Sequence, residues 1–256
     1  MSFLPENQTT SISTHTNEDI FIRDKSLCND LIGKLSFTKM LFFQILGRVP
    51  TEAETAVVDA CLVTLMEHGL TPSALASRLV YSSATEAMQG AVAAGILGVG
   101  SLFVGTMEGA AALIERILAA DDRPAEALAI ATEHKAARLP LPGFGHHMHK
   151  PDDPRSIRLF DVATSEGVAG PHIETIQMLS AAIDEVYGQH ITINATGAIA
   201  AALGDCGVPA QIMRGFAIIT RAAGLVGHIH EEQQKPAMRA IWEAADAAVP
   251  YDGDVG

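Results

Sequence analysis

The sequence predicts an all-α protein on three observations. Apolar side chains recur at intervals of three and four residues through most of the 256-residue chain, which is the period of one helix face. Threonine, aspartate and proline stand at positions that favour helix starts. Aromatic residues make up only 5% of the chain, and only the short run 191–193 alternates as a strand would.

The clearest helix is expected at residues 51–67. Its apolar face is formed by Val57, Val58, Cys61, Leu62, Leu65 and Met66. Thr51 is a candidate N-cap, and a glutamate three residues later completes a capping box. The pattern stops at His68, and Thr71 with the proline after it predicts that another helix starts at once. His68 is therefore expected in a tight junction between two helices.

The remaining helices are expected at about 107–120, 124–137, 154–166, 171–187, 196–204, 209–227 and 236–248. Residues 87–107 are 21 residues without a charge, but glycines and polar side chains make this stretch too weakly hydrophobic for a membrane span. We therefore expect a helix buried in the core or in a subunit interface. Residues 139–153 interrupt the helical pattern with prolines, glycines and histidines, and long irregular connections of this kind often carry function.

The folded part is expected to comprise residues 20–248. Residues 1–19 are rich in serine, threonine and asparagine and are predicted to form a mobile arm. Residues 249–256 are predicted to be frayed. The region between these ends contains no internal repeat.

The composition limits the partners that this chain can have. A count of 17 Lys and Arg against 30 Asp and Glu gives a formal net charge of −13, which argues against nucleic acid or a membrane as a partner. The cysteines Cys28, Cys61 and Cys206 are far apart and odd in number, as expected in a reducing compartment. The first residues lack a basic region followed by an apolar run, so a cytoplasmic location is expected.

The 10 histidines of this acidic chain require an explanation. His146, His147 and His149 crowd one loop, and His228 lies close to two glutamates. The spacing fits none of the usual zinc motifs, so no metal is predicted, although His147 and His149 could take one up adventitiously. The glycines of residues 95–100 lack the spacing and the preceding strand of a dinucleotide fingerprint. Acid–base chemistry remains, because imidazole both gives and takes a proton at neutral pH.

The surroundings of the histidines suit an acidic small molecule. His146 follows Gly143 and Gly145, whose lack of a side chain lets the backbone approach a ligand closely. Arg155 begins a helix soon afterwards, and Arg221 supplies a second cation. Guanidinium groups bind carboxylates through two parallel hydrogen bonds. Together with His68 and His146, these arginines predict a site for a polycarboxylate.

The same residues lie in motifs that resemble those of the citrate synthase superfamily. The motifs are G-F-G-H at 143–146, D-P-R at 153–155, F-A-I-x-x-R-A-A-G-x-x-x-H at 216–228 and the earlier His-Gly junction. The resemblance runs from about Ile20 to Trp242. It is closer to the citryl-CoA lyase group, and to the lyase module at the C-terminus of ATP-citrate lyase, than to the longer citrate synthases.

This resemblance implies an all-α fold with a large and a small helical domain, the small one at roughly 125–220, and a homodimer as the active unit. It implies that His68 stabilises the enol of an acyl-CoA thioester. It also implies that His146 holds and protonates the keto oxygen in synthesis, or takes the proton back in cleavage.

The resemblance further implies the groups that bind substrate. Arg155 and Arg221 resemble the carboxylate clamps, and Arg239 is a weaker candidate, for a clamp given to the neighbouring subunit. The other substrate-binding candidates are Gly145, Asn194 and His228, and the candidates for contacting coenzyme A are Gly100, Gly105 and Gly143. Coenzyme A is implied as part of the substrate thioester, beside a keto acid, with no tightly bound cofactor.

One position departs from the family pattern. Where the family has N-V-D, whose aspartate moves the α-proton of the thioester, this chain has Asn194-Ala-Thr196. A threonine cannot act as a carboxylate base, and loss of a general base costs about 10²–10⁴-fold. The P-L-H-G-G loop of the synthases is also replaced, as in the lyase group. The sequence therefore predicts a citryl-CoA lyase-like carbon–carbon lyase in which water or another acid replaces the aspartate.

Other interpretations stay open. His68 and Thr196 could serve as helix caps. Arg155 and Arg221 could form structural ion pairs, and His228 could be a core histidine. For function, the alternatives are a citrate synthase-type acyltransferase, a site repurposed for a different acyl-CoA cleavage because of Thr196, and a non-catalytic protein that binds coenzyme A esters.

Overall fold

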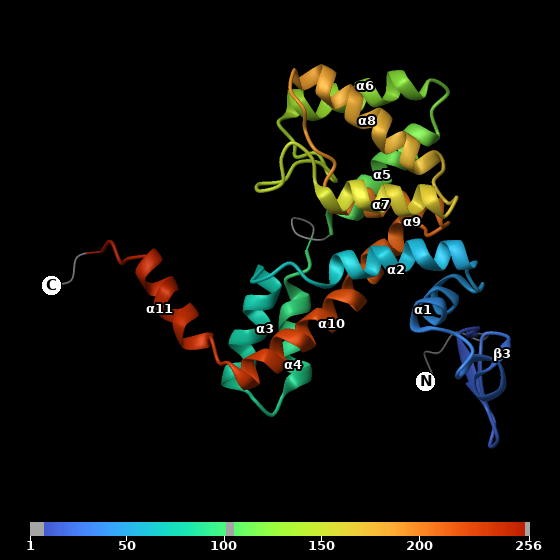
Figure 1. Ribbon diagram of the computed structural model, residues 1–256, viewed down its shortest axis with the longest axis vertical. Coiled ribbons are helices and arrows are strands. Elements are labelled where there is room, and N and C mark those ends of the chain that lie inside the picture. Colours follow the sequence, from blue (N-terminus) through green and yellow to red (C-terminus); the bar gives the residue numbers. More distant parts are fainter. Residues whose placement is uncertain (1–7, 101–104, 254–256) are drawn as a thin grey trace, which may run out of the picture.

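Helices dominate the computed structural model, which describes residues 8–100 and 105–253, so the predicted all-α class is confirmed (Figure 1). The helices are α1 (Phe37–Leu46), α2 (Glu52–Met66), α3 (Pro72–Ser83), α4 (Met88–Leu97), α5 (Thr106–Leu118), α6 (Arg123–Ala137), α7 (Pro154–Ser165), α8 (Pro171–Tyr187), α9 (Ala195–Asp205), α10 (Met213–Gln234) and α11 (Met238–Ala248). A short π-helix, η1 (Leu27–Leu31), and a 3₁₀ turn, η2 (Ala210–Ile212), complete the helical elements.

A small antiparallel sheet precedes these helices. Its strands are β1 (Ser13–His15), β2 (Ile20–Ile22) and β3 (Lys25–Ser26), in the order β1-β2-β3. β1 falls inside the segment predicted as a mobile arm, so that prediction is wrong for residues 13–15, which pair with β2. The strands are too short for their periodicity to be detected in the sequence. Residues 1–7 of the predicted arm and 254–256 of the predicted frayed end lie outside the described residues.

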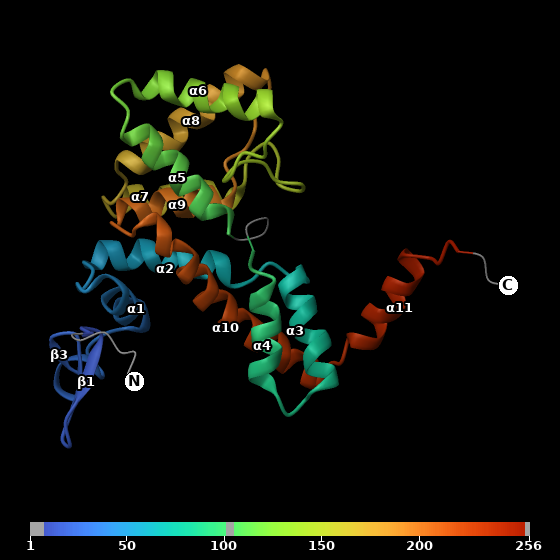
Figure 2. The ribbon, with the colours of Figure 1, turned by 180° about the vertical axis from the view of Figure 1, so that it is seen from behind.

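Helices α5 to α9 gather at one end of the molecule, and α3 and α4 lie at the other (Figures 1 and 2). α2 and α10 cross between them. α9 is the centre of the first group, because Ala198–Leu203 are all fully buried and four of these six residues are alanines, which allow close packing. α5, α7, α8 and α2 all contact this helix. The subdomain boundary predicted at 125–220 stays a prediction.

The structure corrects two predicted helices. The uncharged stretch 87–107 is not one buried helix, because α4 ends at Leu97 and α5 begins at Thr106. The glycines between them favour a break in a helix, and Leu97 is 86% exposed. In the other case, α10 continues to Gln234 beyond the predicted end at 227.

One segment passes a simple test for a membrane span. Residues Ala210–Gln234 are long and apolar enough by length and mean hydropathy alone, and 39% of the tested window is buried inside the molecule. The same helix packs against α2, α3, α4 and α5. Central helices of folded domains commonly have this composition.

A predicted cap holds the start of α2, one of the two helices on either side of His68. The Thr51 hydroxyl accepts the N–H of Glu54 at 3.1 Å, and the Glu54 carboxylate accepts the N–H of Thr51 at 2.8 Å, so the capping box is confirmed. Thr71 precedes α3 without such a side-chain bond. The helices therefore begin where the sequence places them, and His68 lies in the junction between α2 and α3.

Candidate active site

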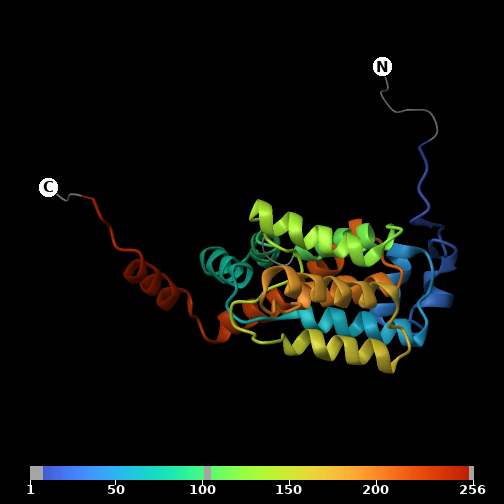
Figure 3. The same ribbon diagram turned by 90° about the horizontal axis from the view of Figure 1, so that it is seen from above.

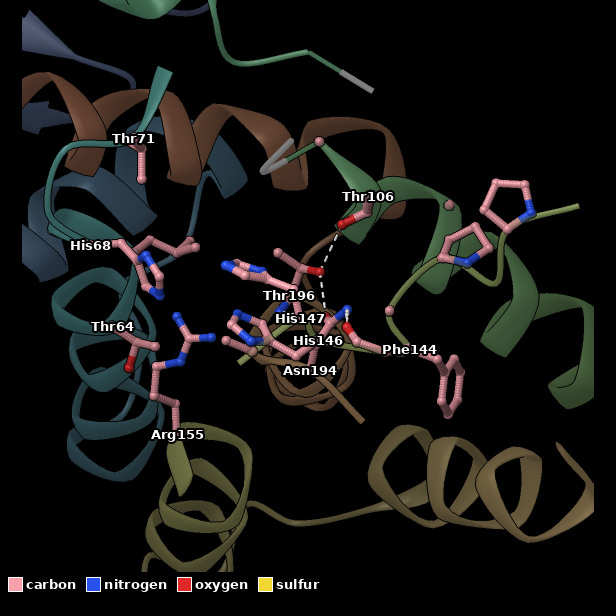
Figure 4. Close-up of a pocket in the computed structure, with 18 of the residues that line it drawn as sticks. Thr64, His68, Thr71, Thr106, Phe144, His146, His147, Arg155, Asn194 and Thr196 are labelled. Carbon is pink, nitrogen blue, oxygen red and sulfur yellow. Dashed lines mark hydrogen bonds between the residues drawn. The ribbon is translucent and has the colours of Figure 1, made fainter. Parts of the chain in front are cut away.

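A cavity of about 1040 Å³ opens between the α2–α3 junction, the loop 139–153 and the starts of α5, α7 and α9 (Figure 4). Predicted site residues from distant parts of the chain meet there. Those that line the cavity are His68, Gly105, Gly143, Gly145, His146, Arg155, Asn194, Thr196 and Arg221.

The backbone of the loop places His146 in the cavity. Gly143 and Gly145 have φ angles of 85° and 79°, a left-handed conformation that favours glycine. A Cβ at Gly143 would lie 2.8 Å from the Cβ of Ala110, so glycine is also needed for close packing against α5. The run 191–193 forms a single bridge between Ile193 and Phe144 rather than a strand, and it anchors this loop.

The two predicted acid–base histidines share the cavity. The ring centroids of His68 and His146 lie 5.9 Å apart, and the ring of His149 stacks on His146 at 4.4 Å. Burial lowers the pKa of His68, and the cation Arg155 lowers it further. Burial also lowers the pKa of His146, with a further contribution from His149. Both imidazoles are therefore neutral at neutral pH.

Backbone contacts fix which nitrogen of His146 carries the proton. The Nδ1 atom accepts the N–H groups of Met148 at 3.1 Å and of His149 at 3.0 Å. A neutral imidazole with a lone pair at Nδ1 carries its proton at Nε2. His146 therefore presents an N–H donor, which suits a keto oxygen or an alkoxide. This favours the donor role implied for synthesis over the role of base implied for cleavage.

The structure also brings together three imidazoles that could hold a metal ion. One nitrogen from each of His68, His146 and His149 lies within 4.8 Å of the others. A metal would need a lone pair from each ring, but the lone pair of His146 is occupied by two backbone N–H groups. Arg155 and Arg221 add positive charge that acts on His68. This set of donors and cations favours an anion over a metal cation.

Arg155 is held by an aspartate at the start of α7. Its Nε and Nη2 lie 2.9 and 2.7 Å from the two carboxylate oxygens of Asp153, which is fully buried. The ion pair considered as an alternative therefore exists. Burial raises the pKa of Asp153, but the hydrogen bonds from Arg155 outweigh this and keep the pKa below its ordinary value. The same guanidinium also lines the cavity, where it can contact a ligand.

Arg221 is a stronger anion site. It is 4% exposed, and its Nε and Nη1 atoms have no hydrogen-bond partner among the described residues. Burial lowers the pKa of this guanidinium, and the charge of Glu67 opposes that shift. A buried cation without partners is unfavourable, so a ligand carboxylate is the expected partner.

The hydroxyl of Thr196 is part of a chain of hydrogen bonds. Its hydroxyl lies 2.7 Å from the Thr106 hydroxyl and donates to Oδ1 of Asn194 at 2.7 Å (Figure 4). Asn194 in turn donates to the carbonyl of Gly145 at 3.0 Å. Because the proton of Thr196 is committed to Asn194, Thr106 must be the donor between the two hydroxyls. Asn194, not Thr196, is the N-cap of α9.

Among the lining residues that were not predicted from the sequence are Thr106, Glu108 and Arg214. Thr106 was missed because its role depends on α5 packing against α9. Glu108 and Arg214 line the cavity as an ion pair at 2.5 Å. Glu108 contributes the sole carboxylate among the described lining residues, and it is committed to Arg214.

Three predicted residues lie elsewhere. Gly100 does not line the cavity, although its carbonyl accepts the N–H of Gly105 at 3.0 Å. His228 is also not a lining residue; it contacts Arg78 and Glu67 behind the cavity wall. Arg239 is 88% exposed on α11, which projects away from the other helices (Figure 3), and it pairs with Glu243. Packing decided these placements, which motif spacing does not encode.

The fold and the site together define a helical protein in which neutral imidazoles and guanidinium groups line one cavity. Residues 15–242 match the family model described as citrate synthase, C-terminal domain. The chain therefore belongs to the citrate synthase family.

Known proteins extend this comparison. The structure of citryl-CoA lyase from Hydrogenobacter thermophilus is 33% identical, with a TM-score of 0.87, and the match covers 97% of this chain and 96% of that one. ATP citrate lyase from Methanosaeta concilii, in complex with (3S)-citryl-CoA, is 20% identical with a TM-score of 0.76 over 98% of this chain and 42% of that one, which shows the shared fold.

Curated sequences point to the same family. Citrate synthase from Synechocystis is 26% identical over 206 residues, which cover 78% of this chain. The match covers 50% of that relative, so this chain spans about half the length of the curated relative it matches.

Proposed function

We propose that this protein cleaves a 3-hydroxy acyl-CoA, as a citryl-CoA lyase does, into an acyl-CoA such as acetyl-CoA and a keto acid such as oxaloacetate. The observation that carries the proposal is the meeting of His68 and His146, 5.9 Å apart, in one cavity with Arg221, whose Nε and Nη1 have no hydrogen-bond partner within the described part of the chain. The similarity to the Hydrogenobacter citryl-CoA lyase over almost the whole of both chains supports this reaction above synthesis.

Each group has a role in this reaction. Arg221 and Arg155 bind carboxylates at the acid end of the substrate. The Nε2–H of His146 donates to the hydroxyl oxygen, which carries negative charge when its proton leaves and becomes the keto oxygen as the carbon–carbon bond breaks. The bonding electrons pass to the thioester, and His68 stabilises the resulting enol.

The protons balance within the cavity. The substrate hydroxyl loses one proton, and the α-carbon of the product acyl-CoA gains one. His68 is neutral and can accept the hydroxyl proton, which turns it into a stronger donor toward the enolate oxygen. Thr196 offers no carboxylate for the final transfer, so water or an imidazole of the loop supplies that proton.

The test is to incubate the protein with citryl-CoA and with related 3-hydroxy acyl-CoA esters, and to measure free keto acid and the shorter acyl-CoA by mass spectrometry. Release of both products from one ester is expected. If no ester is cleaved while the protein remains folded, the proposal is wrong.

A second candidate is a cleavage of a different 3-hydroxy or 3-oxo acyl-CoA that needs no aspartate. The hydrogen bonds that commit Thr196 to Thr106 and Asn194 favour it, because this hydroxyl is part of a built network. Thr196→Asp separates the two. A large gain in citryl-CoA cleavage supports a lyase that lacks its usual base, and loss of every activity supports a repurposed site.

We also propose a homodimer. α11 projects from the body (Figure 3), and its residues are not buried in the chain. An amphipathic helix with an exposed Trp242 commonly packs against a partner. In such a dimer Arg239 would approach the neighbouring subunit, as the sequence predicts. The cytoplasmic location likewise stays a prediction.

A further inference from the structure

Glu67 holds the backbone of the junction that carries His68. Its Oε1 atom accepts the N–H of His68 at 2.7 Å and the N–H of Gly69 at 2.5 Å. Burial raises the pKa of Glu67, but contacts with His228 and with these N–H groups outweigh it, so the pKa lies below its ordinary value. The carboxylate is therefore ionised, and charged acceptors make the stronger hydrogen bonds.

His228 on α10 contacts the other oxygen of the same carboxylate. Its Nε2 atom lies 2.9 Å from Oε2 of Glu67. Its Nδ1 atom accepts the Nε–H of Arg78 at 3.0 Å. Since Nδ1 accepts this bond with its lone pair, the ring carries its proton on Nε2, the nitrogen that lies beside Glu67. His228 therefore has a fixed tautomer and a fixed orientation.

Arg78 is itself immobilised. It is 3% exposed, and its guanidinium also contacts Glu232 at 2.8 Å and the carboxylate of Glu231. These glutamates follow His228 on the next turn of α10. The chain of contacts thus runs from α10 through Arg78 on α3, back to His228, and on to Glu67 at the end of α2.

α10 is also packed tightly against the last turn of α2. The Thr220 hydroxyl donates to the carbonyl of Leu62 at 2.5 Å. A Cβ at Gly224 would overlap the carbonyl oxygen of Met66, so only glycine fits there. Thr220, Gly224 and His228 are spaced four residues apart and lie on one face of α10. This face fixes α2 just before His68. The residue after Thr220 in the chain is the cavity-lining Arg221.

We propose that His228 is a positioning residue, which acts through Glu67 to hold the His68 ring in the cavity. In this role it does not contact the substrate, which differs from the substrate-binding role that the resemblance implies for it. The predicted effect on His68 follows from geometry alone, whereas the effect on cleavage rests on the proposed function.

The test compares His228→Leu with His228→Gln. Leucine removes both the acceptor for Arg78 and the nitrogen that contacts Glu67, whereas the glutamine amide offers a polar atom for each of these places. The matched control is His230→Leu, an exposed histidine on the same helix. We measure the titration of the His68 ring by NMR without substrate, and then kcat and KM for the ester that wild type cleaves.

In His228→Leu, the pKa of His68 should move toward that of free histidine, and kcat should fall about 10–100-fold with a smaller change in KM, as for other residues that orient a functional side chain. His228→Gln should restore most of both properties, and His230→Leu should leave both unchanged. Glu67→Ala should reproduce the shift, and combining it with His228→Leu should add little, because both act through one contact.

The proposal is overturned if His68 titrates as in wild type when His228→Leu or Glu67→Ala is present. It is also overturned if His230→Leu has the same effect. If His228→Leu does not fold, Glu67→Ala still decides whether this contact positions His68, because Glu67 is exposed and its substitution should leave the fold intact. If wild type cleaves no ester, the proposed function fails while the NMR titration still decides the role of His228.

Discussion

Two groups of histidines in this protein have opposite electrostatics. His68 and His146 in the cavity have lowered pKa values, because burial and nearby positive groups disfavour a second charge. His172 at the start of α8 has a raised pKa, chiefly because Asp205 lies 2.9 Å from its Nδ1. The pKa of His190 is also raised, chiefly by Asp184 at 2.6 Å.

The difference shows that the groups around an imidazole determine its protonation state and therefore its role. His172 and His190 each bridge two carboxylates, which stabilise them as cations. Through these contacts His172 links α8 to α5 and α9. The cavity histidines face each other and guanidinium groups, so they stay neutral and can exchange protons or donate to an oxyanion. Because a further positive charge is unfavourable in that cavity, an anionic ligand is favoured there.

The largest expected effect is a loss of activity when a histidine of the cavity is replaced. His146→Ala should lower kcat for the cleaved ester about 10²–10³-fold, the usual loss for a donor to a developing oxyanion. His190→Ala should change it less than about twofold, because that ring lies outside the cavity. Steady-state kinetics on both variants checks this, with circular dichroism to confirm folding. Equal losses would mean that the two groups do not differ in function.

The next largest effect is a loss of stability when a carboxylate partner of His172 is removed. Asp205 accepts the N–H groups of Gly170, His172 and Ile173 as well as the ring of His172. Asp205→Ala should therefore lower the free energy of unfolding by about 3 kcal/mol, because buried donors lose their acceptor. Urea denaturation measures this loss.

The matched control for that variant is Asp152→Ala. Asp152 contacts the more exposed His190 at 3.0 Å. An exposed ion pair contributes about 0–1 kcal/mol, so the loss should be small. A loss as large as that of Asp205→Ala would show that burial does not separate the two contacts.

A smaller effect is the pH dependence of kcat/KM, which tests the protonation state of the two cavity histidines. Because the pKa values of His68 and His146 are lowered, both stay neutral until the pH falls below about 6.5, the ordinary value. kcat/KM should be flat above that pH and should fall by up to about 10-fold per unit below it. An inflection above pH 7 would contradict the neutral state of this pair.

The smallest effect concerns stability and pH at His172. Its folded pKa is raised, so its contribution to stability is fully present below the unfolded value of about 6.5 and is lost as the pH rises through the folded pKa. The stability difference between wild type and His172→Gln, of the order of 1 kcal/mol, should therefore shrink from pH 5.5 to pH 9. Denaturation at several pH values measures it, and a difference that grows with pH would show the opposite shift.

Local signals predicted much of the fold. The capping box at Thr51 and the helix start after Thr71 depend on neighbours within four residues, and the structure has both helices there. The β1 strand and the break after Leu97 were missed. A three-residue strand is stable only through its pairing with β2, and glycines in an apolar stretch do not reveal whether packing will preserve a helix.

The sequence by itself determined the helical class, the helix starts and the residue types of the site, because caps, periodicity and motifs act over a few residues. Only the tertiary structure decided the commitment of Thr196 to Thr106 and the contact of His228 with Glu67. These depend on contacts between elements up to 161 residues apart in the chain, between 67 and 228. Such contacts form only when packing brings the two partners together and removes the water that would otherwise bind them.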